Sequence, residues 1–189
     1  MTVMAMPSSV EHPYRAADIE AMPDDGHRYE LIDGALLVSP GPSWPHQSVV
    51  VRLTVLLDSA CPRDLRVLTA PFDVRPDEFN NYQPDVLVAR YAELEDRYLR
   101  TAPVLVVEVI SPSTGIRDAT LKKAVYERLG VESYWLVNPA RDQPALTVFE
   151  LDGDEYRQVA HVVGDEVFEA EQPYPVRVVP ADLVVGLRP

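Results

Sequence analysis

The sequence is poor in cysteine, in long apolar runs and in basic residues. Cys61 is the only cysteine in 189 residues, which excludes an internal disulfide framework and a metal cluster built from several thiolates. No apolar run approaches the ~20 residues that a membrane-spanning helix needs. The first 14 residues lack the basic start and apolar centre of a signal peptide. We therefore expect a cytoplasmic protein with no membrane partner.

The shortage of basic residues gives the chain a strongly negative charge. Lys and Arg number 17 against 30 Asp and Glu, a net charge of −13, which counts against tight non-specific binding to nucleic acid. The charge is unevenly placed, because residues 142–182 hold ten acids and two bases. Residues 111–130 instead hold four bases and two acids, a net of +2, so a local basic strip remains available for an anionic substrate.

Length and composition are those of one ordinary folded domain over residues 1–189. Hydrophobic residues make up 47% of the chain and charged residues 25%, close to the globular average. The 18 prolines fall between segments rather than in one of them, so they separate short elements. We expect residues 1–15 to be flexible, a core over about 16–139, and a C-terminal β extension over 140–189.

The N-terminal part predicts a short helix, a hairpin and a long helix. The short helix covers 16–22. The hairpin covers 29–38, because Asp33-Gly34 supplies the positive φ angles of a two-residue turn. Apolar residues at helical spacing over 43–60 predict the long helix, with Ser43 as its N-cap.

The remainder predicts an α/β fold in which helices flank a sheet. Apolar and β-branched runs predict strands, and helical spacing that ends at Gly130 predicts a helix. The expected elements are strands 65–74, 85–89 and 104–110, a helix over 117–129 and a strand over 133–137. From Ala145 onward, short β-like runs between turns predict a hairpin and an edge strand.

Glu108 interrupts the most apolar stretch, 104–110. A near-continuous run of β-branched residues is typical of a strand buried on both faces. An ionised carboxylate there costs several kcal/mol unless it is paired or bound to a metal. Two simpler interpretations stay open: a salt bridge to an arginine, or a position at the strand end where the carboxylate reaches solvent.

Asp85 has a similar position at the start of another apolar run, 86–89. By itself, an acid after a proline is an ordinary turn residue. If the two strands lie side by side, both carboxylates converge at one end of the sheet and repel each other unless a cation lies between them or one is protonated. Hard divalent cations such as Mg²⁺ prefer such oxygen ligands. Asp85 and Glu108 together therefore predict a metal site.

The helix over 117–129 supplies a candidate lysine. Its core-facing stripe on a helical wheel consists of Leu121, Val125 and Leu129. Lys122 lies at the edge of this stripe, near Tyr126, and can reach back toward the sheet end, where it could neutralise charge on a phosphate. Lys123 points away and is predicted to be a solvated surface charge. The alternative for Lys122 is an ordinary boundary lysine whose stem covers apolar surface.

Five short segments carry these residues in a fixed order along the chain. They are Tyr29-Glu-Leu-Ile-Asp-Gly34, Gln83-Pro-Asp85, Val107-Glu-Val-Ile-Ser-Pro-Ser-Thr114, Asp118-x-x-x-Lys122-x-x-x-Tyr126 and Gly130-Val-Glu-Ser-Tyr-Trp-Leu-Val-Asn-Pro139. Together they resemble the Uma2 family, a domain of unknown function in the PD-(D/E)XK nuclease superfamily. The resemblance runs in order from about Asp18 to Pro139 and more loosely to the C-terminus.

The resemblance implies a restriction-endonuclease-like core with a mixed central β-sheet and a Mg²⁺-dependent phosphodiesterase site, with Mn²⁺ as an alternative ion. It makes Asp85 and Glu108 the metal ligands, Lys122 the catalytic lysine and Glu30 an additional acid near the site. The superfamily places a lysine two residues after the acid, and this position is Ile110 here. Uma2-like sequences share this departure, which Lys122 on the helix would compensate.

Two further residues are candidates for the same site. His46, at the start of the long helix, could contact a phosphate, although a histidine there is often a partly exposed surface residue. Tyr126 follows Lys122 by one helical turn. Trp44 could stack on a base, whereas Trp135, in an apolar strand, is better explained as a core or interface residue.

These residues predict an endonuclease that cleaves nucleic acid, DNA rather than RNA, with a metal-activated water. The alternative is a catalytically silent module that binds nucleic acid or protein, favoured by the acidic surface and by Ile110. A glycosidase using Asp85 and Glu108 as acid and base is a third possibility, which the basic helix disfavours. The resemblance and the apolar C-terminal strands also lead us to expect a homodimer.

Overall fold

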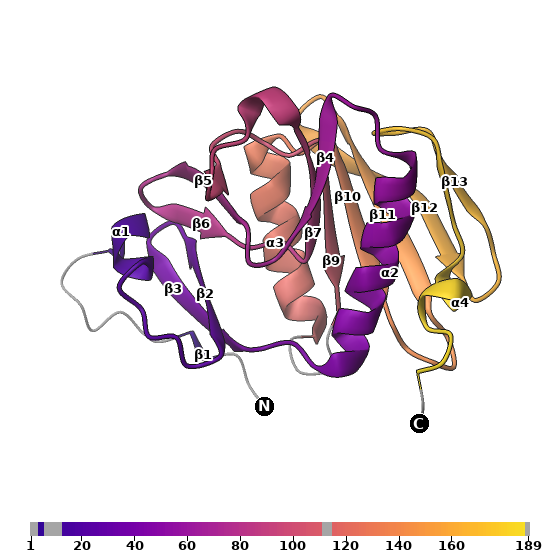
Figure 1. The fold of residues 1–189 in the computed structure, drawn as a ribbon, viewed down its shortest axis with the longest axis horizontal. Helices are drawn as coiled ribbons and strands as arrows, with labels where there is room; N and C mark the ends of the chain where they lie inside the picture. Colours follow the sequence, from indigo (N-terminus) through magenta and orange to yellow (C-terminus); the bar gives the residue numbers. More distant parts are fainter. Residues whose placement is uncertain (1–3, 6–12, 111–114, 188–189) are drawn as a thin grey trace.

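The main feature of the fold is a six-stranded sheet with a long helix on each face (Figure 1). The computed structural model describes residues 4–5, 13–110 and 115–187, without the side chains of residues 4–5 and 115–119. Residues 1–15, which were predicted to be flexible, lie largely outside these ranges. No helix within them is long and apolar enough to cross a membrane.

The elements form two larger sheets, one small sheet and a few helices. The central sheet consists, in spatial order, of β12 (Glu155–Val163), β11 (Ala145–Asp152), β10 (Ser133–Asn138), β9 (Leu105–Val109), β7 (Val86–Arg90) and β4 (Leu65–Thr69). The second sheet consists of β1 (Met4–Ala5), β3 (Ala35–Pro40), β2 (His27–Ile32), β6 (Asn80–Tyr82), β5 (Asp73–Asp77) and β8 (Tyr98–Leu99). The remaining elements are α1 (Ala16–Ile19), α2 (Trp44–Ala60), the 3-10 helix η1 (Tyr91–Glu93), α3 (Gly115–Leu129), the pair β13 (Phe168–Ala170) and β14 (Val176–Val178), and α4 (Pro180–Leu183).

The central sheet is mixed, as predicted. β9 and β10 run parallel and α3 lies between them in sequence, whereas the other neighbouring strands are antiparallel. A parallel pair needs such a crossover, and a helix is its usual form. β7 and β9 are direct neighbours, with Val86 opposite Val107, so the strand that follows Asp85 and the strand that carries Glu108 lie side by side.

Alternation along the strands assigns each face of the sheet to one helix. In β9, Leu105 and Val107 pack in one cluster with Leu53 of α2, whereas Val106 packs in another with Tyr126 of α3. Because successive side chains of a strand point to opposite faces, Glu108 belongs to the α3 face with Val106. The same alternation puts Asp85, just before β7, on that face.

The second sheet packs against the α3 side of the central sheet. Val74, Tyr82 and Leu99 belong to the same apolar cluster as Val106 and Tyr126. Figure 1 shows this sheet at one end of the molecule, beside α3. Its strand β2 therefore brings the N-terminal hairpin to the face that carries Glu108.

The predicted N-terminal hairpin is confirmed. β2 and β3 are antiparallel, and Asp33 and Gly34 between them have φ angles of 51° and 76°. Both values lie in the left-handed region, as a two-residue turn of this kind requires. The helix before it, α1, ends at Ile19, earlier than the predicted Met22.

The two long helices follow the predicted bounds closely. α2 begins after Ser43 and ends at Ala60, although the Ser43 side chain makes no capping hydrogen bond. α3 begins at Gly115 rather than Arg117 and ends at Leu129. Gly130 follows with a φ of 85°, the left-handed conformation that terminates helices and favours glycine.

The single strand predicted over 65–74 is wrong. β4 ends at Thr69 and pairs with β7 in the central sheet, whereas β5 begins at Asp73 and belongs to the second sheet. Pro71 lies between them and has no N–H to donate to a strand ladder. The apolar run therefore crosses from one sheet to the other instead of continuing in one.

The predicted core-facing stripe of α3 is partly wrong. Leu121 is 43% exposed, whereas Lys122 is only 6% exposed. The buried face is centred on Val125 and Tyr126, so the helix is rotated from the predicted position toward Lys122. An all-apolar stripe does not form because buried acids on the neighbouring strands pair with the lysine, which lies inside the molecule rather than at a boundary.

Lys123 is also not the solvated surface charge that was predicted. Its side chain is about one-third exposed, and its ammonium lies 4.8 Å from the centre of the Phe149 ring and 4.0 Å from Glu127 Oε1. A cation over an aromatic face is favourable. Lys123 therefore links α3 to β11.

The C-terminal hairpin and edge strand are confirmed, and they extend the central sheet. β11 pairs with β10, and β12 pairs with β11 to form the edge. Leu146 and Val148 of β11 pack in the same cluster as Trp135, which is fully buried. The interpretation of Trp135 as a core residue is confirmed.

Candidate functional site

Asp85 lies directly before β7, where every oxygen of its carboxylate has a partner. Oδ2 accepts a hydrogen bond from the Val109 backbone N–H of β9 at 2.9 Å and lies 3.0 Å from His46 Nε2. Oδ1 accepts a hydrogen bond from Arg28 at 3.0 Å. The residue is 2% exposed. An acid that its local sequence places in an ordinary turn is therefore buried, with hydrogen-bond partners on both carboxylate oxygens.

Glu108 lies on β9 and pairs with α3. Its Oε1 accepts hydrogen bonds from Lys122 Nζ at 3.1 Å and from the Tyr126 hydroxyl at 2.7 Å. Both simpler interpretations of Glu108 are wrong, because its partner is a lysine and its side chain is buried. Lys122 and Tyr126 are one helical turn apart, so their side chains lie on one helix face and reach the same carboxylate.

Glu30 connects this pair to the second sheet. Its Oε2 lies 3.2 Å from Lys122 Nζ, and its Oε1 accepts a hydrogen bond from the Gln83 backbone N–H at 2.9 Å. Gln83 is two residues before Asp85, so Glu30 also fixes the segment that leads into Asp85. The lysine is thus held between carboxylates from both sheets.

His46 on α2 completes the group. It is 8% exposed, and its Nε2 pairs with Asp85, so the alternative of a partly exposed surface histidine is wrong. Its Nδ1 is buried and has no hydrogen-bond partner among the described residues. α2 and α3 cover opposite faces of the central sheet. His46 therefore reaches Asp85 from the α2 side, whereas Lys122 and Tyr126 reach Glu108 from the α3 side.

The carboxylates differ sharply in proton affinity. Burial raises the pKa of Asp85, but the hydrogen bond from His46 and the positive charge of Arg28 outweigh it and hold the pKa well below its usual range. Burial raises the pKa of Glu108 to about 7, against the attraction of Lys122 and with the help of Asp85 and Glu30. A pair of neighbouring acids with separated pKa values is typical of functional sites.

The cations and the phenol of the group stay protonated at neutral pH. Burial lowers the pKa of Lys122, but Glu108 and Glu30 raise it above its usual value. Burial and the nearby negative charge of Glu108 hold the pKa of Tyr126 well above its usual range. Both therefore remain hydrogen-bond donors to Glu108.

All six residues singled out in the sequence lie in one connected group, namely Glu30, His46, Asp85, Glu108, Lys122 and Tyr126. Arg28 belongs to the same group and was missed. It also donates to the Gln83 backbone carbonyl at 3.2 Å. A signal was present, because Arg28 is two residues before Glu30 in β2 and therefore points to the same face.

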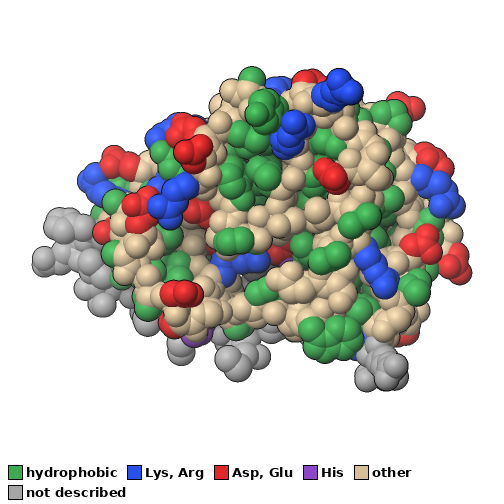
Figure 2. All heavy atoms as spheres, in the orientation of Figure 1, with side chains coloured by type: hydrophobic (Ala, Val, Ile, Leu, Met, Phe, Trp, Pro, Cys, Tyr) green, Lys and Arg blue, Asp and Glu red, His purple; other side chains and the backbone are tan. Residues whose placement is uncertain are grey.

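Figure 2 shows one face of the molecule with a hollow near its lower edge, in and around which acidic, basic and histidine side chains are visible. The carboxylate oxygens of a metal site would come from Asp85 and Glu108. Among the described residues, however, no three His, Cys, Asp or Glu side chains converge as metal ligands.

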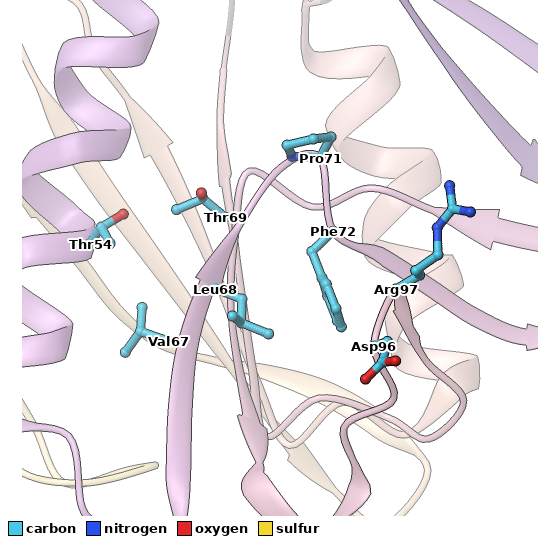
Figure 3. Close-up of a pocket in the computed structure, with 8 residues that line it drawn as sticks. All are labelled: Thr54, Val67, Leu68, Thr69, Pro71, Phe72, Asp96 and Arg97. Carbon is cyan, nitrogen blue, oxygen red and sulfur yellow. The ribbon is translucent and has the colours of Figure 1, made fainter.

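A second hollow, of about 500 Å³, lies elsewhere in the fold (Figure 3). Its lining comes from α2, from β4 and from two loops, and consists of Thr54, Val67, Leu68, Thr69, Pro71, Phe72, Asp96 and Arg97. None of the residues of the charged group lines it. The hollow between α2 and β4 is thus separate from the candidate site.

Comparison with known proteins agrees with this architecture. A family model described as "Uma2: Putative restriction endonuclease" matches residues 16–182. The structure is similar to the crystal structure of "a putative nuclease belonging to DUF820" from Anabaena variabilis ATCC 29413. The TM-score is 0.70 and the identity 18%, over 91% of this chain and 98% of that chain. No curated protein compared with the chain matches it. The predicted fold class is confirmed.

Proposed function

Because the chain belongs to the Uma2 family, we propose that it is a Mg²⁺-dependent endonuclease that hydrolyses phosphodiester bonds of nucleic acid, with DNA as the preferred substrate and Mn²⁺ as an alternative ion. The observation that carries this proposal is the buried group in which Glu108 of β9 pairs with Lys122, while Asp85 lies directly before β7, the neighbouring strand. Fold and family alone do not specify a substrate, so the chemistry is argued from these side chains.

The donor chemistry of the group fits a hard divalent cation. Asp85 and Glu108 would hold it, since carboxylate oxygens are the ligands that Mg²⁺ prefers. Within the described residues, both donors to Glu108 contact Oε1, so Oε2 is the oxygen available to a cation. When bound, such a cation lowers the pKa of a water molecule and polarises a phosphoryl oxygen.

The protein's own residues orient these groups and hold positive charge. Glu30 and Glu108 fix the Lys122 ammonium between them, where it can stabilise negative charge that develops on a phosphate. Tyr126 holds one oxygen of Glu108, and the Val109 N–H holds one oxygen of Asp85. Arrangement in advance of substrate binding is what makes such charges effective.

A catalytically silent binding module remains the second candidate function. The observation that favours it is the completeness of the ion pairing, because Arg28 and His46 already satisfy Asp85 and Lys122 already pairs with Glu108. A network of this kind also serves as a purely structural link between two sheets. The net charge of −13 further opposes binding to a polyanion.

Cleavage assays on three single variants separate the two candidates. Asp85→Asn and Glu108→Gln remove one charge each within the group, and Glu132→Gln removes one from an exposed surface pair with Arg90. We expect Mg²⁺-dependent nicking of supercoiled DNA by the wild type and by Glu132→Gln, and none by the two site variants. Calorimetry with Mn²⁺ should show binding only where cleavage occurs. Activity in Asp85→Asn or Glu108→Gln equal to that of the wild type would refute the assignment.

We further propose that the protein acts in the cytoplasm as a homodimer. Val51 and Val55 of α2 are 58% and 64% exposed, and they lie on the helix that contacts β4, an edge strand of the central sheet. Apolar side chains beside an open strand edge favour association with a second chain. Sedimentation velocity that gives the mass of a single 21.1 kDa chain would contradict the dimer.

A further inference from the structure

Arg28 contacts the Asp85 oxygen that has fewer partners. Among the described residues, Oδ2 is engaged by the Val109 N–H and by His46, whereas Oδ1 is engaged by Arg28 alone. A carboxylate oxygen has two lone pairs, but a guanidinium and a metal ion on the same oxygen repel each other. Binding of a cation at Oδ1 therefore weakens the contact with Arg28 and favours its movement away from this oxygen.

The surroundings of Arg28 allow that movement. Its side chain is held by Asp85 and by the Gln83 carbonyl. It is 14% exposed, compared with 3–9% for the other charged side chains of the group. Arg28 is thus the most solvent-exposed charged side chain of the group.

We propose that Arg28 is an exchangeable counter-ion of this site: a divalent cation displaces it from Asp85 Oδ1, and the released guanidinium binds a phosphate group of the nucleic acid. This inference rests on the proposed function and adds a substrate-binding residue to it. The guanidinium suits the second role, because its planar fork matches two phosphate oxygens at once.

The charge of the group supports the exchange. With Glu30, Asp85 and Glu108 ionised and His46 neutral, Arg28 and Lys122 leave one negative charge uncompensated, and a phosphate would be repelled. A divalent cation reverses the sign to one positive charge while Arg28 stays within reach. One phosphodiester group supplies the matching negative charge. Metal binding thereby makes the site attractive to nucleic acid in a chain whose net charge is −13.

Metal titration tests the first half of this inference. Mn²⁺ is titrated at pH 8 by calorimetry into EDTA-stripped wild type, Arg28→Gln and Arg75→Gln. Arg75 is the matched control, because its side chain is 13% exposed and pairs with Glu20 and Asp73, outside the group. Removal of a competing charge should tighten Mn²⁺ binding to Arg28→Gln by about tenfold or more and leave Arg75→Gln unchanged. Equal or weaker binding by Arg28→Gln overturns the inference.

Binding of a duplex oligonucleotide tests the second half. Ca²⁺ replaces Mg²⁺ to occupy the site, and affinity is measured by fluorescence anisotropy at fixed salt. Arg28→Gln should bind the duplex about tenfold more weakly than the wild type, the loss of one bidentate phosphate contact. Arg28→Lys, which keeps the charge without the fork, should fall between them. Unchanged affinity in Arg28→Gln overturns the phosphate-binding role.

A measurement on the wild type covers the case in which Arg28→Gln does not fold. The side-chain ¹⁵Nε–H signal of Arg28 should shift on addition of Mg²⁺ while that of Arg75 stays in place, and a stationary Arg28 signal overturns the inference. Failure of the proposed function looks different. In that case the wild type itself binds no Mn²⁺, whereas binding by the wild type without a gain in Arg28→Gln refutes the exchange alone.

Discussion

Lys122 Nζ lies 3.1 Å from Glu108 Oε1, in a buried ion pair between α3 and the strand that precedes it. Ile110, directly after β9, holds the position where the sequence resemblance leads to the expectation of a lysine, yet Lys122 reaches Glu108 from the next element along the chain. Glu30 shares this ammonium at 3.2 Å. The pair therefore depends on α3 packing in one rotational setting, with Lys122 rather than Leu121 turned inward.

Lys122→Met should abolish cleavage and weaken the fold. Loss of one positioned charge typically lowers a rate by about 10²–10³-fold, and two buried carboxylates left without their cation should lower the free energy of unfolding by about 3 kcal/mol. Lys123→Met is the control, because Lys123 is the next residue in the chain but is partly exposed and lies over the Phe149 ring. Plasmid nicking and chemical denaturation measure the two effects. Equal loss in both variants would contradict the special role of Lys122.

Glu108 should make stability depend on pH near neutrality. Its pKa is about 7 in the folded protein against 4.5 for an ordinary glutamate, so the folded state binds this proton more tightly. The contribution to stability is then fully present below pH 4.5 and is lost as pH rises through 7. Relative to Glu108→Gln, the wild type should lose up to about 3 kcal/mol between pH 4.5 and 8 without added metal. Parallel pH profiles of the two proteins would contradict this.

Asp85 should contribute in the opposite direction. Its folded pKa lies below the usual 3.8, so its stabilising effect is complete above that value and disappears only as pH falls below it. The two carboxylates therefore titrate in separate windows. Asp85→Asn should remove the acid window and move the neutral one to lower pH, because the charge of Asp85 helps to raise the pKa of Glu108; urea denaturation at a series of pH values can resolve both changes.

His46→Ala should weaken metal binding without changing the metal ligands. Removal of a partner that orients a ligating carboxylate typically lowers metal affinity by about 10–100-fold. His27→Ala is the control, because His27 is exposed and pairs with Asp25 on the surface. Calorimetry with Mn²⁺ gives both affinities, and equal values for His46→Ala and the wild type would exclude an orienting role.

Gly130→Ala should lower stability without affecting the site chemistry. The φ of 85° at Gly130 costs a residue with a β-carbon about 1–2 kcal/mol. Gly130→Asn should lose less, since asparagine tolerates this conformation better. Thermal denaturation of the two variants gives the order, and a more stable Gly130→Ala would contradict the helix-termination argument.

Features encoded in local sequence were predictable, and those set by tertiary packing were not. The turn at Asp33-Gly34 and the helix end at Gly130 depend on φ angles that few residues adopt, so short sequence signals identify them. The acids Asp85 and Glu108 were visible because each stands in or beside an apolar run. The prediction that these two acids lie near each other required only that the two strands beside them pair.

The failures have a common physical cause. The run over 65–74 is mostly apolar, and its apolar pattern alone does not show that it passes from one sheet to another around Pro71. The helical wheel placed Leu121 inward because it weighs apolar residues alone and ignores buried ion pairs. Arg28 was missed because its partner, Asp85, is distant in sequence and is brought close only when β2 pairs with β6, the strand that leads toward Asp85.

Arg28 and Glu30 come from a different sheet than Asp85 and Glu108, and this division couples activity to the persistence of the contact between the two layers. Partial opening that releases β2 would remove the outer cation and one partner of Lys122 while the central sheet remains intact. The protein should thus lose function before it loses its main core. Amide hydrogen exchange in β2 would report how often this strand opens, and therefore how often the site is incomplete.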